Sequence, residues 1–301
     1  MDRLDSMRIA LAVADGGSLS AAARALRRPL PTVSRGLSEL ESRLKARLFN
    51  RSTRRLTMTD AGAEYIAACR GILEDITAAE RAAAGEFAAP QGELVISAPI
   101  VFGRLHVLPV ITQFLRAFPD IDIRLLLTDR MANLWEDQVD VAVRIGTLSD
   151  SRLVATRLGQ TRRTVVASPE YLRAHGRPKV PADLSAFPCI AFEALGNTET
   201  WTFGEGARPM SVAIRPRLTV NTAEAAIDAA LDHLGITRVL TYQVAQTLGD
   251  GRLEALLERF APPAAPIHLV YGPQARVPLK LRAFLDFAAA RLRERLKAGG
   301  R

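Results

Sequence analysis

The chain has 301 residues, of which 48% are hydrophobic, so it is long enough for two or three domains with cores of their own. Its net charge of +8 is unevenly placed: residues 1–60 carry twelve Lys and Arg against six Asp and Glu, which leaves +2 for the other 241 residues. A basic small domain beside a nearly neutral large one predicts a polyanionic partner for the first part only. The two cysteines, Cys69 and Cys189, form neither a disulfide framework nor a metal pattern, and we expect both to be small buried apolar residues.

Neither a targeting segment nor a membrane span is predicted. The apolar run near the N-terminus is broken by Arg8 and lacks a cleavage region, and no stretch reaches the roughly 20 apolar residues of a transmembrane helix. We therefore expect a cytoplasmic protein without a membrane partner.

The sequence has no recognisable catalytic, cofactor or metal motif. Its four histidines form no metal-spaced pair, no serine lies in a G-x-S-x-G setting, and neither a P-loop nor a G-x-G-x-x-G run is present. We expect no cofactor, no metal and no enzymatic activity.

Residues 18–44 have the spacing of a helix-turn-helix. Ser18 is placed to cap a short helix that extends to Leu26, Pro29 breaks the chain, and Pro31 suits the first turn of the next helix. The second helix carries one apolar stripe at steps of four, three and four, formed by Val33, Leu37, Leu40 and Leu44. Its opposite face is polar, as in a recognition helix that meets base edges.

Flanking segments complete a predicted head of residues 1–59. Gly16 and Gly17 end a first helix, whose apolar positions are Leu4, Met7, Leu11 and Ala14. Leu48 and Phe49 close the small core. Residues 50–59 alternate apolar and polar positions around turn-forming residues, which predicts a short hairpin, or wing.

The polar face of the second helix and the wing supply the candidate DNA contacts. Arginine donors can pair with guanine O6 and N7 and a threonine methyl can meet a thymine methyl, while wing arginines suit phosphates or the minor groove. Any one arginine is alternatively a surface charge or an ion-pair partner of Glu39 or Glu41, and Ser34 alternatively bonds to its own helix. The candidate residues are Arg28, Pro31, Thr32, Ser34, Arg35, Arg51, Thr53, Arg54 and Arg55.

A long helix is predicted over 61–87, capped by Thr59 or Asp60, within a linker of residues 60–89. Its apolar stripe is formed by Ile66, Cys69, Leu73, Ile76, Ala79 and Ala83. About 27 residues at 1.5 Å each give a helix of about 40 Å, longer than the small head can cover. A second copy of the helix could cover it, which predicts a homodimer; the alternative is a linker packed on its own chain.

Residues 90–301 alternate strands and helices, the pattern of an α/β domain with a parallel sheet. The expected elements of the first set are strands at 94–97, 121–127 and 139–145 and helices at 105–118 and 133–138. Those of the second set are strands at 163–167, 189–192, 218–220 and 235–240 and a helix at 223–234. A last strand at 267–271 and a helix at 279–296 return to the first lobe, so lobe I is about 90–162 and 268–301, and lobe II about 163–267.

The head resembles the DNA-binding region of LysR-type transcriptional regulators. The residues that carry the resemblance are Ser18, Ala21, Ala22, Ala23, Leu26, Pro31, Val33, Ser34, Arg35, Leu40, Glu41, Leu44, Leu48, Phe49, Arg51, Arg54, Arg55, Leu56, Thr59, Ala61 and Gly62. Segments 92–130, 140–146, 157–172 and 283–292 also fit the family, so the resemblance covers essentially the whole chain. Two places depart from it: Arg28-Pro29-Leu30 replaces an apolar residue, a serine cap and a frequent glutamine, and Lys45 replaces a common helix-ending glycine.

The resemblance implies a winged helix-turn-helix, a linker helix that pairs two subunits, and a two-lobed effector domain like a periplasmic binding protein. It implies promoter DNA as partner, assembly as a dimer of dimers, contact with RNA polymerase, and a small effector, such as a carboxylate or an aromatic compound, between the lobes. The competing hypothesis is a small-molecule-binding or -processing α/β protein with a basic N-terminal appendage.

Ligands of doubly wound lobes lie beyond the carboxyl ends of strands, near helix N-termini, where free N–H groups favour an anion. Arg144 complements such an anion or pairs with an acidic neighbour. The candidate effector-binding residues are Pro99, Ile100, Phe102, Gly103, Thr128, Arg144, Gly146, Phe192, Asn221 and Thr222.

Overall fold

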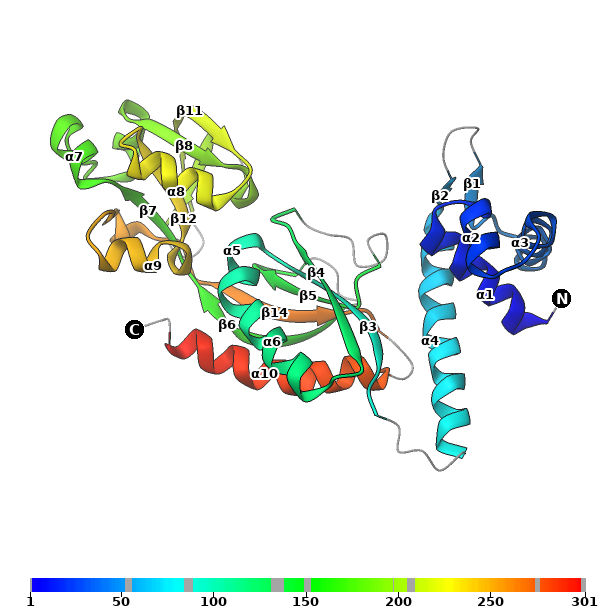
Figure 1. Ribbon diagram of the computed structural model, residues 1–301. Coiled ribbons are helices and arrows are strands. Elements are labelled where there is room, and N and C mark those ends of the chain that lie inside the picture. Colours follow the sequence, from blue (N-terminus) through cyan, green and yellow to red (C-terminus); the bar gives the residue numbers. More distant parts are fainter. Residues whose placement is uncertain are drawn as a thin grey trace.

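The computed structural model describes residues 2–51, 56–83, 89–130, 138–148, 153–196, 198–204, 209–273 and 277–298. A helical head with a two-stranded hairpin is followed by a long helix, and two sheets with their helices form the remainder of the chain (Figure 1).

Three helices form the head: α1 (Arg3–Gly16), α2 (Leu19–Ala25) and α3 (Leu30–Leu44). As predicted, the Ser18 hydroxyl accepts the Ala21 N–H at 3.1 Å and so caps α2. α1 packs behind α2 and α3 but buries Ser6, Ile9, Ala10 and Val13, not the stripe that predicted the helix. Both stripes are apolar, so periodicity did not decide which one faces the core.

The prediction that Leu44 lies inside is wrong. Val33, Leu37 and Leu40 are fully buried, but Leu44 is 37% exposed. Leu44 is the last residue of α3, and Lys45, in the left-handed region at φ 52°, turns the chain away from the core.

The wing has the predicted antiparallel strands, β1 (Phe49–Arg51) and β2 (Leu56–Met58). Helix α4 (Asp60–Ala83) follows it, and the Thr59 hydroxyl accepts the Gly62 N–H at 3.0 Å, which confirms the predicted cap. The predicted end of this helix near 87 lies outside the described residues. Ile66 and Cys69 are buried in the head, so the first part of the predicted dimer seam belongs to the head instead.

Lobe I has a five-stranded sheet in the order β4-β3-β5-β14-β6. The strands are β3 (Gly92–Ala98), β4 (Ile121–Leu127), β5 (Val141–Ile145), β6 (Val154–Thr161) and β14 (Ala265–Tyr271). β4, β3 and β5 are parallel as predicted, but β14 pairs antiparallel with both of its neighbours, β5 and β6, so the sheet is mixed. The last strand does return to lobe I, as expected.

One continuous helical stretch and the C-terminal helix pack against lobe I (Figure 1). Their segments are α5 (Ile100–Phe102), a π-helical turn η1 (Gly103–Val107), α6 (Leu108–Ala117) and α10 (Leu279–Ala298). The helical stretch therefore starts five residues before the predicted position 105. Pro109 has no N–H for the Leu105 carbonyl, and that carbonyl accepts instead from Arg295 Nη2 at 3.0 Å.

Lobe II has a second five-stranded sheet, in the order β11-β8-β12-β7-β13. Its strands are β7 (Arg163–Ala167), β8 (Pro188–Phe192), β11 (Arg215–Val220), β12 (Ile236–Leu240) and β13 (Glu254–Leu256). Its helices are α7 (Pro169–His175), α8 (Ala223–Leu231) and α9 (Thr241–Gly249). Short 3-10 turns, η2 (Pro181–Ala186), η3 (Glu193–Leu195) and η4 (Glu258–Phe260), and a hairpin of β9 (Thr200–Phe203) and β10 (Met210–Ala213) complete it.

Several lobe II elements differ from expectation. α8 ends at Leu231 instead of 234, because the chain enters the left-handed region at His233, φ 62°. β13, α7, α9 and the β9–β10 hairpin were not predicted. β12 and β8 pair in parallel, while β7 pairs antiparallel with both of its neighbours, β12 and β13. The helix expected at 133–138 lies almost wholly outside the described residues.

Candidate DNA interface and effector site

The N-terminal half of α3 presents most of the predicted recognition residues to solvent. Pro31, Thr32 and Arg35 are exposed and Ser34 is half-buried, while the stripe behind them is buried. Pro29 occupies the cap position and makes no side-chain hydrogen bond, as the departure at Arg28-Pro29-Leu30 predicts. The positive end of the α3 dipole is therefore not neutralised by a capping side chain.

Arg28 lies in the turn between α2 and α3 and is held by α1. Its Nη1 atom is 2.7 Å from Asp5 Oδ2. The hydrogen bond with Arg28 lowers the pKa of Asp5, and the same bond raises the pKa of Arg28. Its side chain is 39% exposed, so the guanidinium is paired within the head and still open to solvent.

The base of the wing is fixed by α3 and α4. Glu41 Oε1 accepts the backbone N–H groups of Leu48 at 2.8 Å and Phe49 at 3.2 Å. Gly62, in the first turn of α4, lies so close to the Leu48 carbonyl that a Cβ atom would collide with it. The Arg51 side chain and residues Thr53, Arg54 and Arg55 lie outside the described part of the structure.

An open groove of about 680 Å³ runs between α1, α2 and α4. Its apolar lining includes Leu11, Ala12, Leu26 and Leu73, with Arg8, Asp15 and Arg24 among the polar ones. On α4, Ile72 is 42% exposed, and Leu73 and Ile76 are half-buried. An apolar helix face is thus left uncovered in the single chain.

The carboxyl ends of β3 and β4 are tied together where the effector is expected. The Thr128 N–H donates to the Ala98 carbonyl at 3.0 Å, and the Ile100 N–H donates to Asp129 Oδ1 at 3.0 Å. Asp129 thus occupies the start of α5, beside Pro99. Burial raises the pKa of Asp129, and its Oδ2 atom has no hydrogen-bond partner among the described residues.

Asp129 corrects the expected chemistry of this helix start. A free Ile100 N–H was the reason to place an anion there, but that N–H already has a carboxylate acceptor. The sequence offered one signal, an acidic residue directly after Thr128, which follows the strand. Asp129 Oδ2, by contrast, is a buried acceptor without a donor among the described residues.

The other candidate effector residues divide into surface and interior. Phe102 is fully buried in the lobe I core and Phe192 is 6% exposed under α8, so neither presents its ring to solvent. Gly103 is buried, and a Cβ atom there would collide with Leu127. Sequence periodicity placed these residues near strand ends but could not show which way they point.

Four further candidates remain at the strand and helix ends. Asn221 is exposed, and the Thr222 hydroxyl caps α8 by accepting the Ala225 N–H at 3.4 Å. Gly146, at φ 115°, donates its N–H to the Pro266 carbonyl at 2.8 Å. Arg144 is half-buried on β5, opposite His268 of β14.

The two lobes meet at the α5–η1 stretch. Val101 of lobe I is 2% exposed and packs, with Leu105, in a cluster otherwise formed by lobe II. The ring of Phe102 meets the Tyr242 ring edge-on at 5.5 Å, and Arg104 Nε lies 4.0 Å from Glu224 Oε1. Burial, followed by the charge of Asp129, raises the pKa of Tyr242. The α5–η1 stretch therefore contacts both the strand ends of lobe I and the residues of lobe II.

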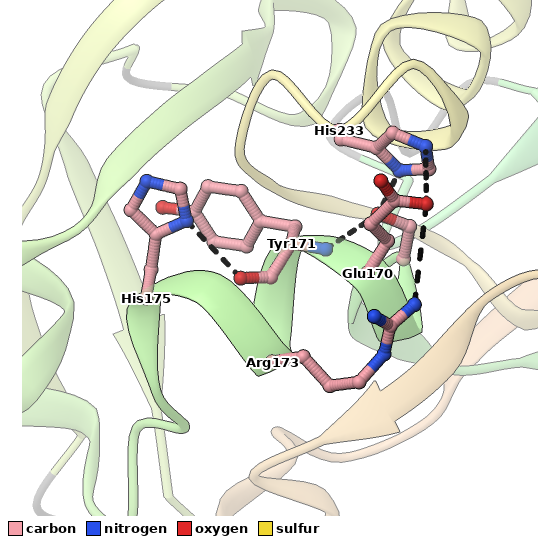
Figure 2. Close-up of polar contacts among 6 residues, drawn as sticks. Glu170, Tyr171, Arg173, His175 and His233 are labelled. Atoms are coloured by element: carbon pink, nitrogen blue, oxygen red, sulfur yellow. Dashed lines mark hydrogen bonds and ion pairs between the residues drawn. The ribbon is translucent and has the colours of Figure 1, made fainter.

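A serine, a histidine and a glutamate form a chain of contacts at α7. Figure 2 shows the histidine, His233, beside Glu170. Ser168 Oγ lies 2.7 Å from His233 Nδ1, and His233 Nε2 lies 3.3 Å from Glu170 Oε2. The serine is 1% exposed, and its hydroxyl accepts the Tyr171 N–H as the α7 cap. These contacts fix α7 to the end of α8; a buried capping hydroxyl is not positioned to attack a substrate.

The described residues include no metal-binding cluster and one long apolar helical stretch. Among the residues that the structure describes, no group of three or more His, Cys, Asp and Glu side chains could hold a metal ion. The stretch Ile100–Ala117 is long and apolar enough to cross a membrane, but its buried residues, such as Val110 and Phe114, pack in the lobe I core.

Both halves of the chain match known families. Residues 4–63 match the bacterial regulatory helix-turn-helix proteins of the lysR family, and residues 88–293 match the LysR substrate binding domain. The transcriptional regulator CrgA of Neisseria meningitidis serogroup C is 34% identical over 292 residues, which cover 96% of each chain.

Solved structures agree with this over nearly the full length. The structure of CrgA from Neisseria meningitidis has a TM-score of 0.61 at 32% identity and covers 96% of this chain and 98% of its own. Full-length LysG from Corynebacterium glutamicum, solved with arginine as bound effector, has a TM-score of 0.71 at 20% identity and covers 97% and 99%, which supports the fold alone.

The relatives are transcriptional regulators and not enzymes, and the domains that match are one for DNA and one for a small-molecule effector. The α/β architecture with its helix-turn-helix head agrees with this assignment. The chain belongs to the LysR family of transcriptional regulators, which bind promoter DNA and small-molecule effectors.

Proposed function

We propose that α3 enters the major groove of operator DNA, with Thr32, Ser34 and Arg35 on base edges. The observation that carries this is the exposed polar half of α3 on a small head with most of the chain's net charge. Arg35 offers two parallel donors for guanine, and the unneutralised start of α3 suits a phosphate.

The remaining candidate DNA-binding residues contact the sugar-phosphate backbone of the DNA. Arg28 and the wing arginines Arg51, Arg54 and Arg55 neutralise phosphates or reach the minor groove, Thr53 donates a hydrogen bond to a phosphate oxygen, and Pro31 packs along the groove. Such contacts supply affinity that depends on salt and little on sequence.

The experiment compares Arg35→Ala and Arg54→Ala in gel-shift titrations on DNA from upstream of the gene and on random DNA. Arg35→Ala should cost about 1–3 kcal/mol on the upstream DNA and little on random DNA. Arg54→Ala should weaken both more evenly and flatten the salt slope by about one. Unchanged binding by both variants over the salt series rules this interface out.

The assembly we propose is a homodimer through α4, and a dimer of dimers at the promoter. The open groove along α1, α2 and α4, with exposed Ile72 beside it, gives a second copy of α4 an apolar face to cover. The dimer then acts in the cytoplasm, on the nucleoid, and contacts RNA polymerase when bound beside a promoter.

The effector we propose is a small molecule, a carboxylate or an aromatic compound, bound between the lobes at the strand ends. Pro99, Ile100, Thr128, Gly146 and Asn221 border this place. A donor group of the effector faces Asp129 Oδ2, and Arg144 takes a carboxylate if there is one. Phe102, Gly103 and Phe192 support it from within the lobe cores, and Thr222 through its cap of α8.

A further inference from the structure

A second cavity lies in lobe II, on the side of the sheet that the β9–β10 hairpin covers. Its volume is about 160 Å³, and its walls include Phe203 of β9, Thr164 and Val165 of β7, and Leu256 of β13. Three arginines also line it: Arg162, Arg163 and Arg238. A cavity with three cationic side chains in a mainly apolar wall is unusual, because buried charges are normally paired.

Arg238 is the central group of this cavity. It is 5% exposed, its Nη1 atom donates to the Thr202 carbonyl at 3.5 Å, and its guanidinium lies 5.2 Å from the Trp201 ring centroid. Its Nε–H has no hydrogen-bond partner among the described residues. A guanidinium has five donors, and the Nε–H of Arg238 is one that is buried without an acceptor in the part of the chain that the structure describes.

The charge around Arg238 is positive. Burial, and then the positive charge of Arg163, lower the pKa of Arg238 to about 9, so the guanidinium remains protonated at neutral pH. Burial also lowers the pKa of Arg163. Among the described residues, the carboxylate in the lining is Glu258, an exposed residue whose charge is not among the causes of either shift.

Strand pairing brings the two arginines to one face. Val165 is the cross-strand partner of Arg238, and Leu240 is that of Arg163. Residues 163 and 165 share a face because strand side chains alternate, and antiparallel partners share it too. Both guanidinium groups therefore project from neighbouring strands toward the same space under the hairpin.

We propose that this cavity binds a small oxyanion, held by Arg238 and Arg163, with Arg162 at the entrance. An oxyanion supplies the acceptors that the buried Arg238 lacks and offsets two like charges. A volume of 160 Å³ equals about five water molecules at about 30 Å³ each, which suits sulfate, phosphate or a two- to four-carbon carboxylate. The site is separate from the strand-end effector site and does not depend on it.

The cavity lies beside the two segments in which the chain crosses between the lobes. Arg162 lies in the first chain crossing between lobes, from β6 to β7, and Ala261 and Pro262 lie in the second, from η4 to β14. Thr241, also in the lining, lies 3.2 Å from the hydroxyl of Thr161 at the end of β6. An anion bound here contacts both crossings and braces the lobes against each other.

The test measures thermal unfolding of the full-length protein in sodium sulfate, sodium phosphate and sodium oxalate, with sodium chloride holding the ionic strength constant. Sulfate and phosphate stabilise proteins in general, so the readout is a saturable rise in Tm that differs between wild type and variants. Sulfate and phosphate probe a tetrahedral oxyanion, and oxalate probes a carboxylate.

We expect wild type to show a saturable rise that Arg238→Met abolishes. Arg163→Gln should raise the apparent Kd about tenfold or more, the effect of one charge-assisted hydrogen bond. Arg217→Gln, an exposed arginine on β11 of the same sheet, is the matched control and should respond like wild type. Hydrogen exchange should show added protection in β7, β12 and residues 256–262.

Each outcome decides the proposal. No saturable rise in any of the salts overturns it, and so do equal rises in wild type, Arg238→Met and Arg163→Gln. Arg238→Met should fold, because removal of an unpaired buried charge is neutral or stabilising. If Arg238→Met does not fold, the measurement on Arg163→Gln decides, since Arg163 is only half-buried. An unchanged Kd in Arg163→Gln then overturns the proposal.

Discussion

At the scale of single residues, Glu41 joins the recognition helix to the wing. One carboxylate oxygen accepts the N–H groups of Leu48 and Phe49, where the chain leaves α3 and enters β1. Buried donors left without an acceptor cost about 1–3 kcal/mol. The sequence offered Glu41, like Glu39, as an ion-pair partner for an arginine of the head, and these two bonds give it a structural role in addition.

Glu41→Ala should therefore destabilise the head by about 1–3 kcal/mol, measured by chemical denaturation of the full chain. Glu41→Gln is the control, because its amide oxygen can still accept both N–H groups, and it should retain most of the stability. Equal losses in the two variants would mean that the charge of Glu41, and not its acceptor geometry, holds the wing.

At the scale of elements, the α5–η1–α6 stretch depends on a helix far away in sequence. The helical stretch passes Pro109 through a π turn, and the Leu105 carbonyl is satisfied by Arg295 of α10 at 3.0 Å. Burial lowers the pKa of His106, next to it, and the positive charge of Arg295 lowers it further. One guanidinium thus satisfies a helix carbonyl and adds to the lowering of a nearby imidazole's pKa.

Arg295→Met should cost about 1–3 kcal/mol in unfolding free energy, because the Leu105 carbonyl loses its donor. The pKa of His106 should rise at the same time, since a nearby positive charge is removed, and an NMR titration measures it. Arg282→Met, an exposed change on the same helix, should alter neither. An unchanged His106 titration in Arg295→Met contradicts the assigned contact.

The linker helix α4 has an apolar face that the single chain leaves partly uncovered. Leu73 and Ile76 are half-buried in the single chain, and Leu73 lines the groove. Replacing both with Asp places charges where the second subunit should pack, and unpaired buried charge is costly. We expect the variant to lose the dimer in light scattering and two-half-site DNA binding with it, while the effector domain stays folded. A variant that remains fully dimeric would show that the dimer interface does not include Leu73 and Ile76.

The same elements show what sequence patterns could and could not decide. The steps of Val33, Leu37 and Leu40 predicted α3 and its buried face, because one face of that helix is clearly apolar. In α1 two adjacent stripes are apolar, and only packing selected the one with Ile9. The antiparallel pairing of β14 with β6 depends on how distant segments return to the sheet, which local periodicity does not encode.

The candidate effector site shows a second limit. Strand ends were predicted well enough to bring Pro99, Thr128 and Asn221 into consideration, but not the direction of each side chain. Phe102 and Phe192 are therefore in the core, and Asp129, which no periodic pattern selects, satisfies the first N–H of α5. Contacts between residues 29 positions apart require the fold.

At the scale of the whole molecule, the strand-end site and the lobe junction are parts of one connected region. Asp129 binds the start of α5, the next residues, Val101 and Phe102, pack against lobe II, and Arg104 faces Glu224. An effector changes DNA binding only by as much as it favours one arrangement of the subunits over another. Contacts at the start of α5 are where that preference can reach the lobe junction.

We therefore expect Asp129→Asn and Arg144→Ala to lose the response to effector while binding DNA normally without it. Asn keeps an acceptor for the Ile100 N–H, so the fold should persist, but it removes the carboxylate that an effector donor would meet. The measurement is footprinting of DNA upstream of the gene, with a panel of small carboxylates and aromatic acids. In wild type, one of these should shift affinity 5- to 150-fold, about 1–3 kcal/mol of coupling. Arg124→Gln, an exposed change on β4, should respond like wild type, and a wild-type response in both site variants would exclude this edge as the effector site.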